Sequence, residues 1–200
     1  MAERALEGVD PAVPSMARIY DYGLGGTDNH PVDREISDRV GTVMPESRKV
    51  AVLNRALLRR AVRYLAGEAG IRQFLDLGSG LPTRDNTHQV AGREAPDVRV
   101  VYVDDDPAVR AHAAALLSED GRTAVVTADL RDTEAVLAHP DVVRLLDFDE
   151  PLGVLMSGIL HHFPASDDLA LFPGIATRSR HETEVGPIES LIVGGVARKE

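Results

Sequence analysis

From residue 71 onward, short apolar runs alternate with amphipathic segments. The runs are rich in β-branched residues and end at acids or glycines, which predicts strands at residues 73–77, 98–103, 123–127 and 152–156. The intervening segments predict helices at residues 86–95, 107–117 and 133–138. This alternation is typical of an α/β fold with a doubly wound, mostly parallel sheet. A last strand is predicted at about residues 190–196.

Before residue 71 the pattern is helical. Residues 15–22 can form a short helix, and the glycines that follow it end that helix. Pro31 can begin a second helix, and a third is predicted at residues 45–66, where apolar residues form a stripe. We expect this third helix to expose Arg59, Arg60 and Arg63, whereas the place of Arg55 stays open. Residues 1–14 contain two prolines and mixed charge, which predicts a flexible N-terminus.

Length and composition narrow the choice of function. Two hundred residues with 44% hydrophobic content suit one globular domain. A net charge of −10 disfavours nucleic acid and anionic membranes as partners. The chain has no cysteine, and residues 1–10 lack the apolar run of a signal peptide. No apolar run reaches the ~20 residues of a membrane span, so we expect a cytoplasmic protein.

A glycine turn follows the first predicted strand. Gly78-Ser79-Gly80 leaves the carboxyl end of residues 73–77, where ligands bind in open α/β sheets. Asp104 ends the second strand, 24 residues after Gly80, which is the spacing of an acid that binds ribose hydroxyls. The turn and the acid together predict a nucleoside-type ligand. The alternative is an ordinary βαβ turn without a ligand.

Other acids lie at the ends of the same strands. Asp76 could bond the turn amides or a ligand's amino group, or it could only cap the turn. Asp129 follows the third strand and could accept from an adenine amino group, or it could cap the helix at residue 133. Of Asp105 and Asp106, we expect one to cap the helix that begins at Pro107.

The sequence of the glycine turn also indicates which kind of nucleotide or nucleoside is bound. The dinucleotide fingerprint needs a third glycine, but residue 83 is threonine and Pro82 lies in the turn. No cluster of basic residues follows to face a pyrophosphate, and an acid at the ribose disfavours NADP. The pattern therefore favours a nucleoside without phosphates, such as S-adenosylmethionine.

These motifs resemble those of class I S-adenosylmethionine-dependent methyltransferases. The resemblance rests on Asp76-Leu-Gly-Ser-Gly80, Val103-Asp104, Ala128-Asp129 and Leu160-His-His-Phe163. More narrowly, Ala17-Arg-Ile-Tyr-Asp-Tyr-Gly-Leu-Gly-Gly-Thr-Asp-Asn29 is similar to a motif of an actinobacterial family, long a domain of unknown function and since called the S-adenosyl methyltransferase family. The stretches from Phe74 to Thr83 and from Val100 to Pro107, and the closing Gly194-Gly-Val-Ala-Arg-Lys199, resemble the same family.

The resemblance implies a helical cap, residues 15–70, over a Rossmann-like core, residues 71–200, within one domain. It assigns Gly78 and Gly80 to the methionine part of the cofactor, Asp104 to the ribose and Asp129 to the adenine. The full set of candidate cofactor-binding residues is Tyr22, Gly25, Gly26, Asn29, Asp76, Gly78, Ser79, Gly80, Asp104, Asp105, Asp129, Leu130 and Ser157. One departure is the segment from residue 164 to 190, which is shorter than in the family, so we expect a shortened C-terminal part.

Methyl transfer needs positioning, and it needs a base only when the nucleophile carries a proton. His161 and His162 follow the fourth strand, and His162 could be that base. The alternative is that one histidine packs or caps and the other faces solvent. The histidines have no metal-binding spacing, and we expect no metal.

We therefore predict an S-adenosylmethionine-dependent methyltransferase that acts on a small-molecule acceptor and releases S-adenosylhomocysteine. A non-catalytic module that binds these compounds is the alternative, and an NAD-dependent oxidoreductase is less favoured. The acceptor and the oligomeric state stay open.

Overall fold

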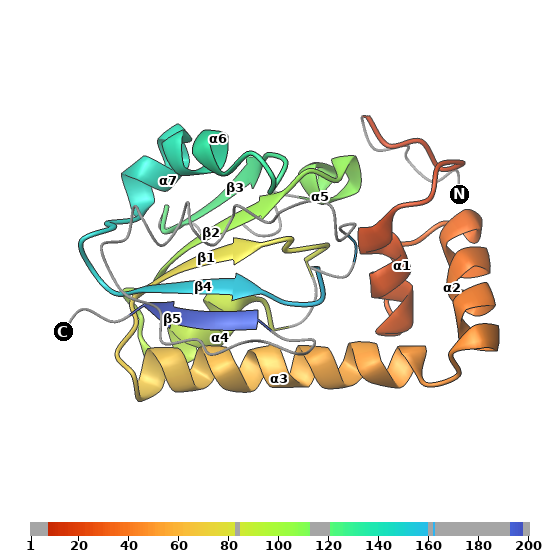
Figure 1. Ribbon diagram of the computed structural model, residues 1–200, viewed down its shortest axis with the longest axis horizontal. Helices are drawn as coiled ribbons and strands as arrows, with labels where there is room; N and C mark the ends of the chain where they lie inside the picture. Colours follow the sequence, from red (N-terminus) through yellow and green to blue (C-terminus); the bar gives the residue numbers. More distant parts are fainter. Residues whose placement is uncertain (1–7, 83–84, 113–120, 160–161, 163–192, 198–200) are drawn as a thin grey trace.

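The structure is a computed structural model that describes residues 8–82, 85–112, 121–159, 162 and 193–197. Its centre is a five-stranded sheet in the order β3-β2-β1-β4-β5 (Figure 1). Four strands are parallel, and the fifth is antiparallel to β4. Their bounds are β1 Gln73–Leu77, β2 Arg99–Asp104, β3 Thr123–Thr127, β4 Leu152–Met156 and β5 Val193–Ala197. The strand order reverses between β1 and β4, which is where open α/β sheets bind their ligands.

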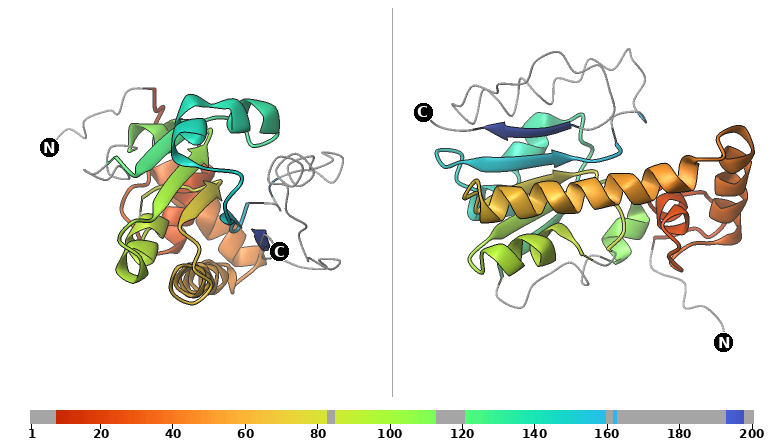
Figure 2. Two further views of the ribbon diagram at one scale, coloured as in Figure 1. Left: turned by 90° about the vertical axis from the view of Figure 1, so that its left-hand side faces the viewer. Right: turned by 90° about the horizontal axis from the view of Figure 1, so that it is seen from below.

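Helices cover both faces of this sheet. On one face lie α3 (Ser47–Gly67) and α4 (Thr87–Glu94), and on the other lie α6 (Thr133–Ala138) and α7 (Pro140–Leu145), as Figures 1 and 2 show. Successive residues of β1 alternate between the two resulting cores. Phe74 packs in the cluster with α3 and α4, and Leu75 packs in the cluster with α6 and α7. Because both faces are covered, every residue of β1 is buried, including the polar Gln73 and Asp76, and Phe74, Leu75 and Leu77 enter the two cores.

The sequence predicted most of these elements. Strands β1, β3 and β4 and helix α6 have the predicted bounds, and the α/β fold with a helical cap is confirmed. The sequence missed α7, which begins at Pro140 directly after His139 ends α6. Helix α5 spans Pro107–Ala111, and residues 113–117 of its predicted length lie outside the described residues.

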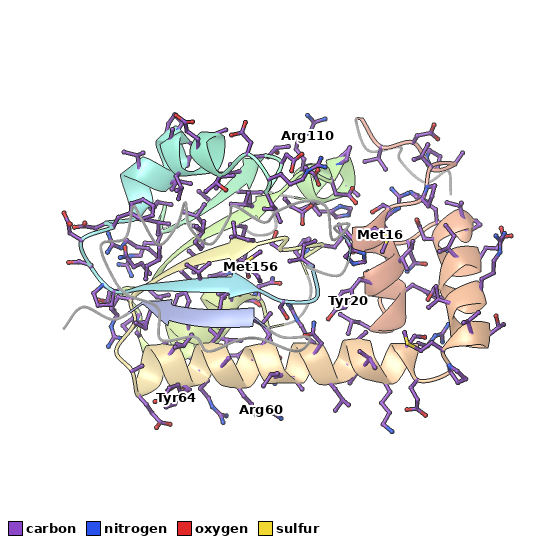
Figure 3. All side chains as sticks on the ribbon, in the orientation of Figure 1. Met16, Tyr20, Arg60, Tyr64, Arg110 and Met156 are labelled. Atoms are coloured by element: carbon purple, nitrogen blue, oxygen red, sulfur yellow. The ribbon has the colours of Figure 1, made fainter. Side chains whose placement is uncertain are left out.

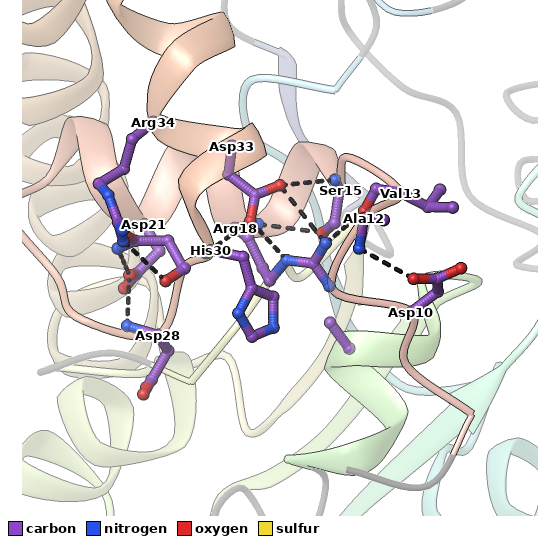
Figure 4. Close-up of polar contacts among 12 residues, drawn as sticks. Asp10, Ala12, Val13, Ser15, Arg18, Asp21, Asp28, His30, Asp33 and Arg34 are labelled. Carbon is purple, nitrogen blue, oxygen red and sulfur yellow. Dashed lines mark hydrogen bonds and ion pairs between the residues drawn. The ribbon is translucent and has the colours of Figure 1, made fainter. Parts of the chain in front are cut away.

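The cap consists of α1 (Met16–Gly23), α2 (Pro31–Val43) and the first half of α3, which continues past the ends of the strands (Figure 2). Asp33 joins the cap helices, because it accepts hydrogen bonds from the Arg18 side chain at 2.7 Å and from the backbone amides of Ser15 and His30 at 2.9 and 2.8 Å (Figure 4). Burial alone would raise the pKa of Asp33, but these bonds and the Arg18 charge outweigh burial and lower it.

Arg34, the neighbour of Asp33 along the chain, takes no part in this network. The Arg34 side chain instead donates to the backbone and side-chain oxygens of Asn29, at 3.0 and 2.9 Å. Neighbouring residues on a helix face different directions, whereas Arg18 comes from another helix that packs on α2.

A side-chain contact ties the cap to α5, the helix that follows β2. Ser15 caps α1 by accepting from the Arg18 amide, and its hydroxyl donates to the carboxylate of Asp106. Asp106 in turn caps α5 by accepting from the Ala108 amide at 2.7 Å. The expectation that one acid of the 105–106 pair caps this helix is thus confirmed. No helix in the described part of the chain is both long and apolar enough to cross a membrane.

Candidate active site

A cavity of about 530 Å³ lies at the carboxyl ends of β1, β2 and β4, under the cap. Its sheet side is formed by the turn after β1 and by residues that follow β2, β3 and β4. Its cap side includes Met16 and Tyr20 of α1, which face the ends of the strands in Figure 3. The predicted residues that line it are Asp76, Gly78, Ser79, Gly80, Asp104, Asp105, Asp129, Leu130, Ser157 and His162.

The turn after β1 presents bare backbone to this cavity. Gly78 and Gly80 have φ angles of 68° and 66°, which favour glycine. A Cβ on Gly78 would lie 2.6 Å from the Ile159 side chain, whereas a Cβ on Gly80 would meet nothing within 4 Å. Gly78 is therefore needed for packing, and Gly80 leaves open space beside the backbone. Among the described residues, the buried hydroxyl oxygen of Ser79 has no hydrogen-bond partner.

Asp104 stands at the end of β2, beside that turn. Its carboxylate accepts from the backbone amides of Gly80 at 2.8 Å and Asp106 at 3.0 Å. Burial raises the pKa of Asp104, although the two amide bonds oppose the rise. The carboxylate thus lines the cavity in a fixed orientation.

Asp76 lies deeper, at the end of β1, and is 5% exposed. It does not cap the turn: its carboxylate accepts from the Thr87 hydroxyl of α4 at 2.6 Å. Burial raises the pKa of Asp76 to about 6, while the Thr87 bond and the nearby Arg55 charge oppose the rise. A buried carboxylate that lines a cavity and has a raised pKa is a candidate functional group.

Asp129 is held at the rim by Arg131. The two side chains form a forked ion pair with contacts of 2.6 to 3.0 Å, and Arg131 lowers the pKa of Asp129. Asp129 does not cap α6, because Asp132 takes that place by accepting from the Ala135 amide. Leu130 lines the cavity and is also part of the core.

Ser157 belongs to a chain of side chains that links β4 to the cap. The Ser157 hydroxyl donates to the side-chain oxygen of Asn54 at 3.1 Å, and the side-chain nitrogen of Asn54 donates to the Tyr20 hydroxyl at 3.0 Å. The Tyr20 hydroxyl donates in turn to the backbone oxygen of Ala51 at 3.2 Å. Because the Ser157 proton is used in this way, its oxygen can accept a bond from a ligand in the cavity.

Sequence analysis missed three side chains of this site, Tyr20, Asn54 and Arg55. Both α3 residues lie on the same side of the helix as its buried residues Val62, Leu65 and Ala66, but in the half that extends past the sheet. Arg55 lines the cavity near Asp76 and donates to the Asp85 backbone oxygen and the Asn86 side chain, both at 3.4 Å. The available signal was spacing: Arg55 precedes Leu58 and Val62 by three and seven residues, which puts a charged side chain on the apolar face of the helix.

Four predicted residues of the cap do not line the cavity: Tyr22, Gly25, Gly26 and Asn29. Tyr22, Gly26 and Asn29 instead take part in contacts within the cap. The side-chain nitrogen of Asn29 donates to the Asp21 carboxylate and to the Gly26 backbone oxygen. The guanidinium of Arg48 stacks on the Tyr22 ring, with 4.6 Å between its central carbon and the ring centroid. A Cβ on Gly26 would collide with the Asp21 carboxylate. Their contact with a cofactor stays a prediction, whereas these contacts hold the cap together.

Of the two predicted catalytic histidines, the structure describes His162. His162 lines the cavity, and its backbone amide donates to the Ile159 oxygen at 3.0 Å. His161 lies outside the described residues. Within the described segments, no three His, Asp or Glu residues form a group that could hold a metal ion.

Comparison with known proteins identifies the protein family to which these features belong. A family model described as S-adenosyl methyltransferase matches residues 2–199. A Thermobifida fusca YX protein, described as a candidate methyltransferase, is 48% identical with a TM-score of 0.79, over 87% of this chain and 64% of that chain. A DUF574 family protein from Streptomyces avermitilis MA-4680 is 42% identical with a TM-score of 0.77, over 83% of this chain and 63% of that chain.

The chain thus spans less than two thirds of the length of these two proteins. A comparison with curated proteins found no significant match. The family model covers nearly all of the chain and includes the glycine turn, the strand-end acids and the N-terminal motif. The chain belongs to the S-adenosyl methyltransferase family.

Proposed function

We propose that the chain binds S-adenosylmethionine in this cavity and transfers its methyl group to a small-molecule acceptor. One observation carries the proposal: Asp76, Asp104 and Asp129 end three neighbouring parallel strands and line one cavity around a bare glycine turn. Carboxylates suit a ligand that has hydroxyl and amino donors, carries a positive charge and has no phosphates.

The residues of the cavity fit the parts of this ligand. Among the described residues, Asp104 accepts two backbone amide bonds, and its two oxygens have further lone pairs for the ribose hydroxyls. Asp129 stands one strand further out, where an adenine amino group could donate to it. The open space at Gly80 and the unsatisfied Ser79 hydroxyl leave room and a polar partner for the rest of the cofactor.

S-adenosylmethionine supplies a methyl group already activated by a sulfonium, so the protein mainly has to align the acceptor with it. The lining also includes the apolar side chains of Met16, Leu58 and Ile159 and the oxygen of Ser157, which we assign to the acceptor. Because the Asn54 bond uses the Ser157 proton, Ser157 can accept from the O–H or N–H of an acceptor. His162 lines the cavity and is our candidate for removing that proton.

Calorimetry with S-adenosylhomocysteine, S-adenosylmethionine and NAD tests the binding. We expect heats of binding for the first two at micromolar concentration and none for NAD. No heat at high micromolar concentration with either adenosyl compound would reject the proposal.

Release of S-adenosylhomocysteine in the presence of a panel of small hydroxyl and amine compounds tests the transfer. One acceptor that raises the release above background, and loses this effect in His162→Ala, would support both the activity and the histidine. Binding without release for every class of acceptor would instead favour a binding module.

A further inference from the structure

The hydrogen bonds that link the cap to the end of β4 have a fixed direction. Their chain ends at the backbone oxygen of Ala51, which can only accept, so the Tyr20 hydroxyl donates to it at 3.2 Å. Because a hydroxyl has one proton, Tyr20 must accept from Asn54, which therefore turns its side-chain nitrogen toward Tyr20, at 3.0 Å. The side-chain oxygen of Asn54 then faces Ser157 and accepts its proton, at 3.1 Å. A backbone carbonyl of α3 thus sets the direction of the Ser157 hydroxyl.

The segment after β4 is packed between the glycine turn and the cap. A Cβ on Gly78 would lie 2.6 Å from the Ile159 side chain, which places this segment against the turn after β1. A Cβ on Gly158 would lie 3.0 Å from the side-chain nitrogen of Asn54, which places the segment against α3. Ser157 lines the cavity from this position.

The order of the strands places Ser157 beside the reacting methyl group. Along the carboxyl edge of the sheet, Asp129 follows β3, Asp104 ends β2, the glycine turn leaves β1, and Ser157 follows β4. A cofactor with its adenine at Asp129, its ribose at Asp104 and its sulfur at the turn leaves the end of β4 for the acceptor.

We propose that Asn54 and Tyr20 are positioning residues that hold the Ser157 oxygen with its lone pairs toward the methyl group, and that the acceptor is an amine. This inference rests on the proposed function and chooses between the hydroxyl and amine acceptors that it allows. With its proton bonded to Asn54, Ser157 can accept a hydrogen bond from the acceptor but has no proton to donate to it.

An amine can use such an oxygen throughout the transfer. The nitrogen lone pair forms the bond to the methyl carbon, the sulfur–carbon bond breaks, and the electron pair of that bond stays on sulfur. An N–H group meanwhile donates to Ser157, and this bond strengthens as positive charge develops on the nitrogen. The surplus proton leaves the methylated nitrogen after the transfer, to a base such as His162 or to water.

A hydroxyl acceptor fits the same oxygen poorly. It has a single proton, and that proton must leave as the methyl group arrives. While the proton is bonded to Ser157 it is withheld from a base, and the Ser157 hydroxyl is itself too weak a base to take it. A hydroxyl that has already lost its proton would meet the lone pairs of Ser157. The fixed direction of Ser157 therefore favours nitrogen over oxygen.

Sinefungin probes this position without a known acceptor, because it carries an amine where S-adenosylmethionine carries its methyl-bearing sulfonium. Calorimetry compares sinefungin with S-adenosylhomocysteine, which has no group at that point. Ser157→Ala should weaken sinefungin by about tenfold to a hundredfold, because hydrogen bonds from a charged donor are strong. The affinity for S-adenosylhomocysteine should stay within about twofold, since it makes no such bond.

A double-mutant cycle tests the direction of the chain. Tyr20→Phe keeps the ring but removes the hydroxyl, so the Asn54 amide can turn over, donate to Ser157 and free the Ser157 proton to face the cavity. Sinefungin should then bind about fivefold more weakly or worse, with S-adenosylhomocysteine unchanged. In an Asn54→Asp background the carboxylate can only accept from Ser157, so adding Tyr20→Phe should change the affinity for sinefungin by less than about twofold. Tyr64→Phe is the matched control, because this tyrosine of α3 is exposed and lies away from the cavity (Figure 3), and it should change neither affinity.

Equal losses for both ligands, or no loss for either, in Ser157→Ala and Tyr20→Phe would overturn the inference while leaving the proposed function in place. A Tyr20→Phe effect of the same size in both backgrounds would overturn the role of Asn54. Release of S-adenosylhomocysteine with hydroxyl compounds but not with amines would overturn the choice of an amine. Failure of wild type to bind S-adenosylhomocysteine would reject the proposed function itself. Circular dichroism checks that each variant is folded, and if one of the two single variants does not fold, the other decides.

Discussion

The backbone amide of Gly80 donates a 2.8 Å hydrogen bond to the carboxylate of Asp104. This bond joins the glycine turn after β1 to the end of β2. The two features that the sequence singled out for binding a nucleoside therefore hold each other in place. A change in either one should affect the position of the other as well as the ligand.

Replacing Asp104 tests the ribose contact. We expect Asp104→Asn to weaken S-adenosylhomocysteine and adenosine alike, tenfold to a hundredfold, because hydrogen bonds to a charged group contribute about 1.5–3 kcal/mol. Calorimetry measures both affinities. Asp38→Asn, which changes an exposed acid of α2, should leave both unchanged. An unchanged affinity for Asp104→Asn would contradict the placement of the ribose.

The two glycines of the turn should respond differently to alanine. Gly80→Ala should lower the free energy of unfolding by about 1–3 kcal/mol, the cost of an unfavourable φ. No steric cost is added, because the new Cβ would meet no atom within 4 Å. Gly78→Ala should cost about 1–3 kcal/mol more, because its Cβ would press on Ile159. Urea denaturation measures the difference, and the double variant Gly78→Ala, Ile159→Ala should recover part of it. Equal losses for the two glycines would contradict the close packing of Gly78.

Asp76 should favour binding of the cofactor but lower the free energy of unfolding. Its pKa is raised to about 6, from 3.8, chiefly by burial, so the folded protein binds this proton more tightly than the unfolded chain. The free energy of unfolding should therefore fall as pH rises from about 4 to 6. Asp76→Asn should remove this loss and stabilise the protein at pH 7.5 by up to about 3 kcal/mol.

Denaturation of wild type and Asp76→Asn at pH 4, 6 and 7.5 checks this. The stabilising effect should be largest at pH 7.5 and small at pH 4. The charged or titratable groups that face Asp76 are Arg55 of α3 and Tyr102 and Asp104 of β2, and Asp104→Asn controls for the last of them. A variant that is equally destabilised at every pH would show that the Thr87 bond outweighs the cost of burial.

Two ion pairs of the cap allow a comparison of buried and exposed charges. Asp33→Ala should destabilise the protein by about 3–5 kcal/mol, because it leaves Arg18 buried without its carboxylate. Asp38→Ala should cost less than about 1 kcal/mol, because its pair with Arg48 is exposed. Thermal melting at pH 7 measures both, and similar losses would contradict the role of Asp33.

The same pair should also respond to acid. The pKa of Asp33 is lowered in the folded state, because the Arg18 and amide bonds outweigh its burial. Its contribution is therefore present above pH 3.8 and is lost as pH falls through the folded pKa. Asp33→Asn should weaken this part of the acid transition.

The sequence predicted the sheet well because its strands are buried on both faces. Phe74 and Leu75 enter opposite cores, so adjacent positions of the strand are both apolar, which makes the strand easy to recognise. The acids at the strand ends followed from the same pattern. Arg55 and Asn54 could not be assigned in this way, because the helical pattern does not show that α3 extends beyond the sheet. The partner of Asp33 was likewise out of reach, since it depends on how two helices cross.

The contact between Ser15 and Asp106 has a consequence for how the cap moves. Ser15 starts α1 and Asp106 starts α5, so one hydroxyl–carboxylate contact joins the first turns of two helices that both line the cavity. Lifting α1 would break this contact, while Ser15 would keep its bond from the Arg18 amide and Asp106 its bond from the Ala108 amide. The rate at which α1 separates from α5 should therefore be sensitive to a single hydroxyl group.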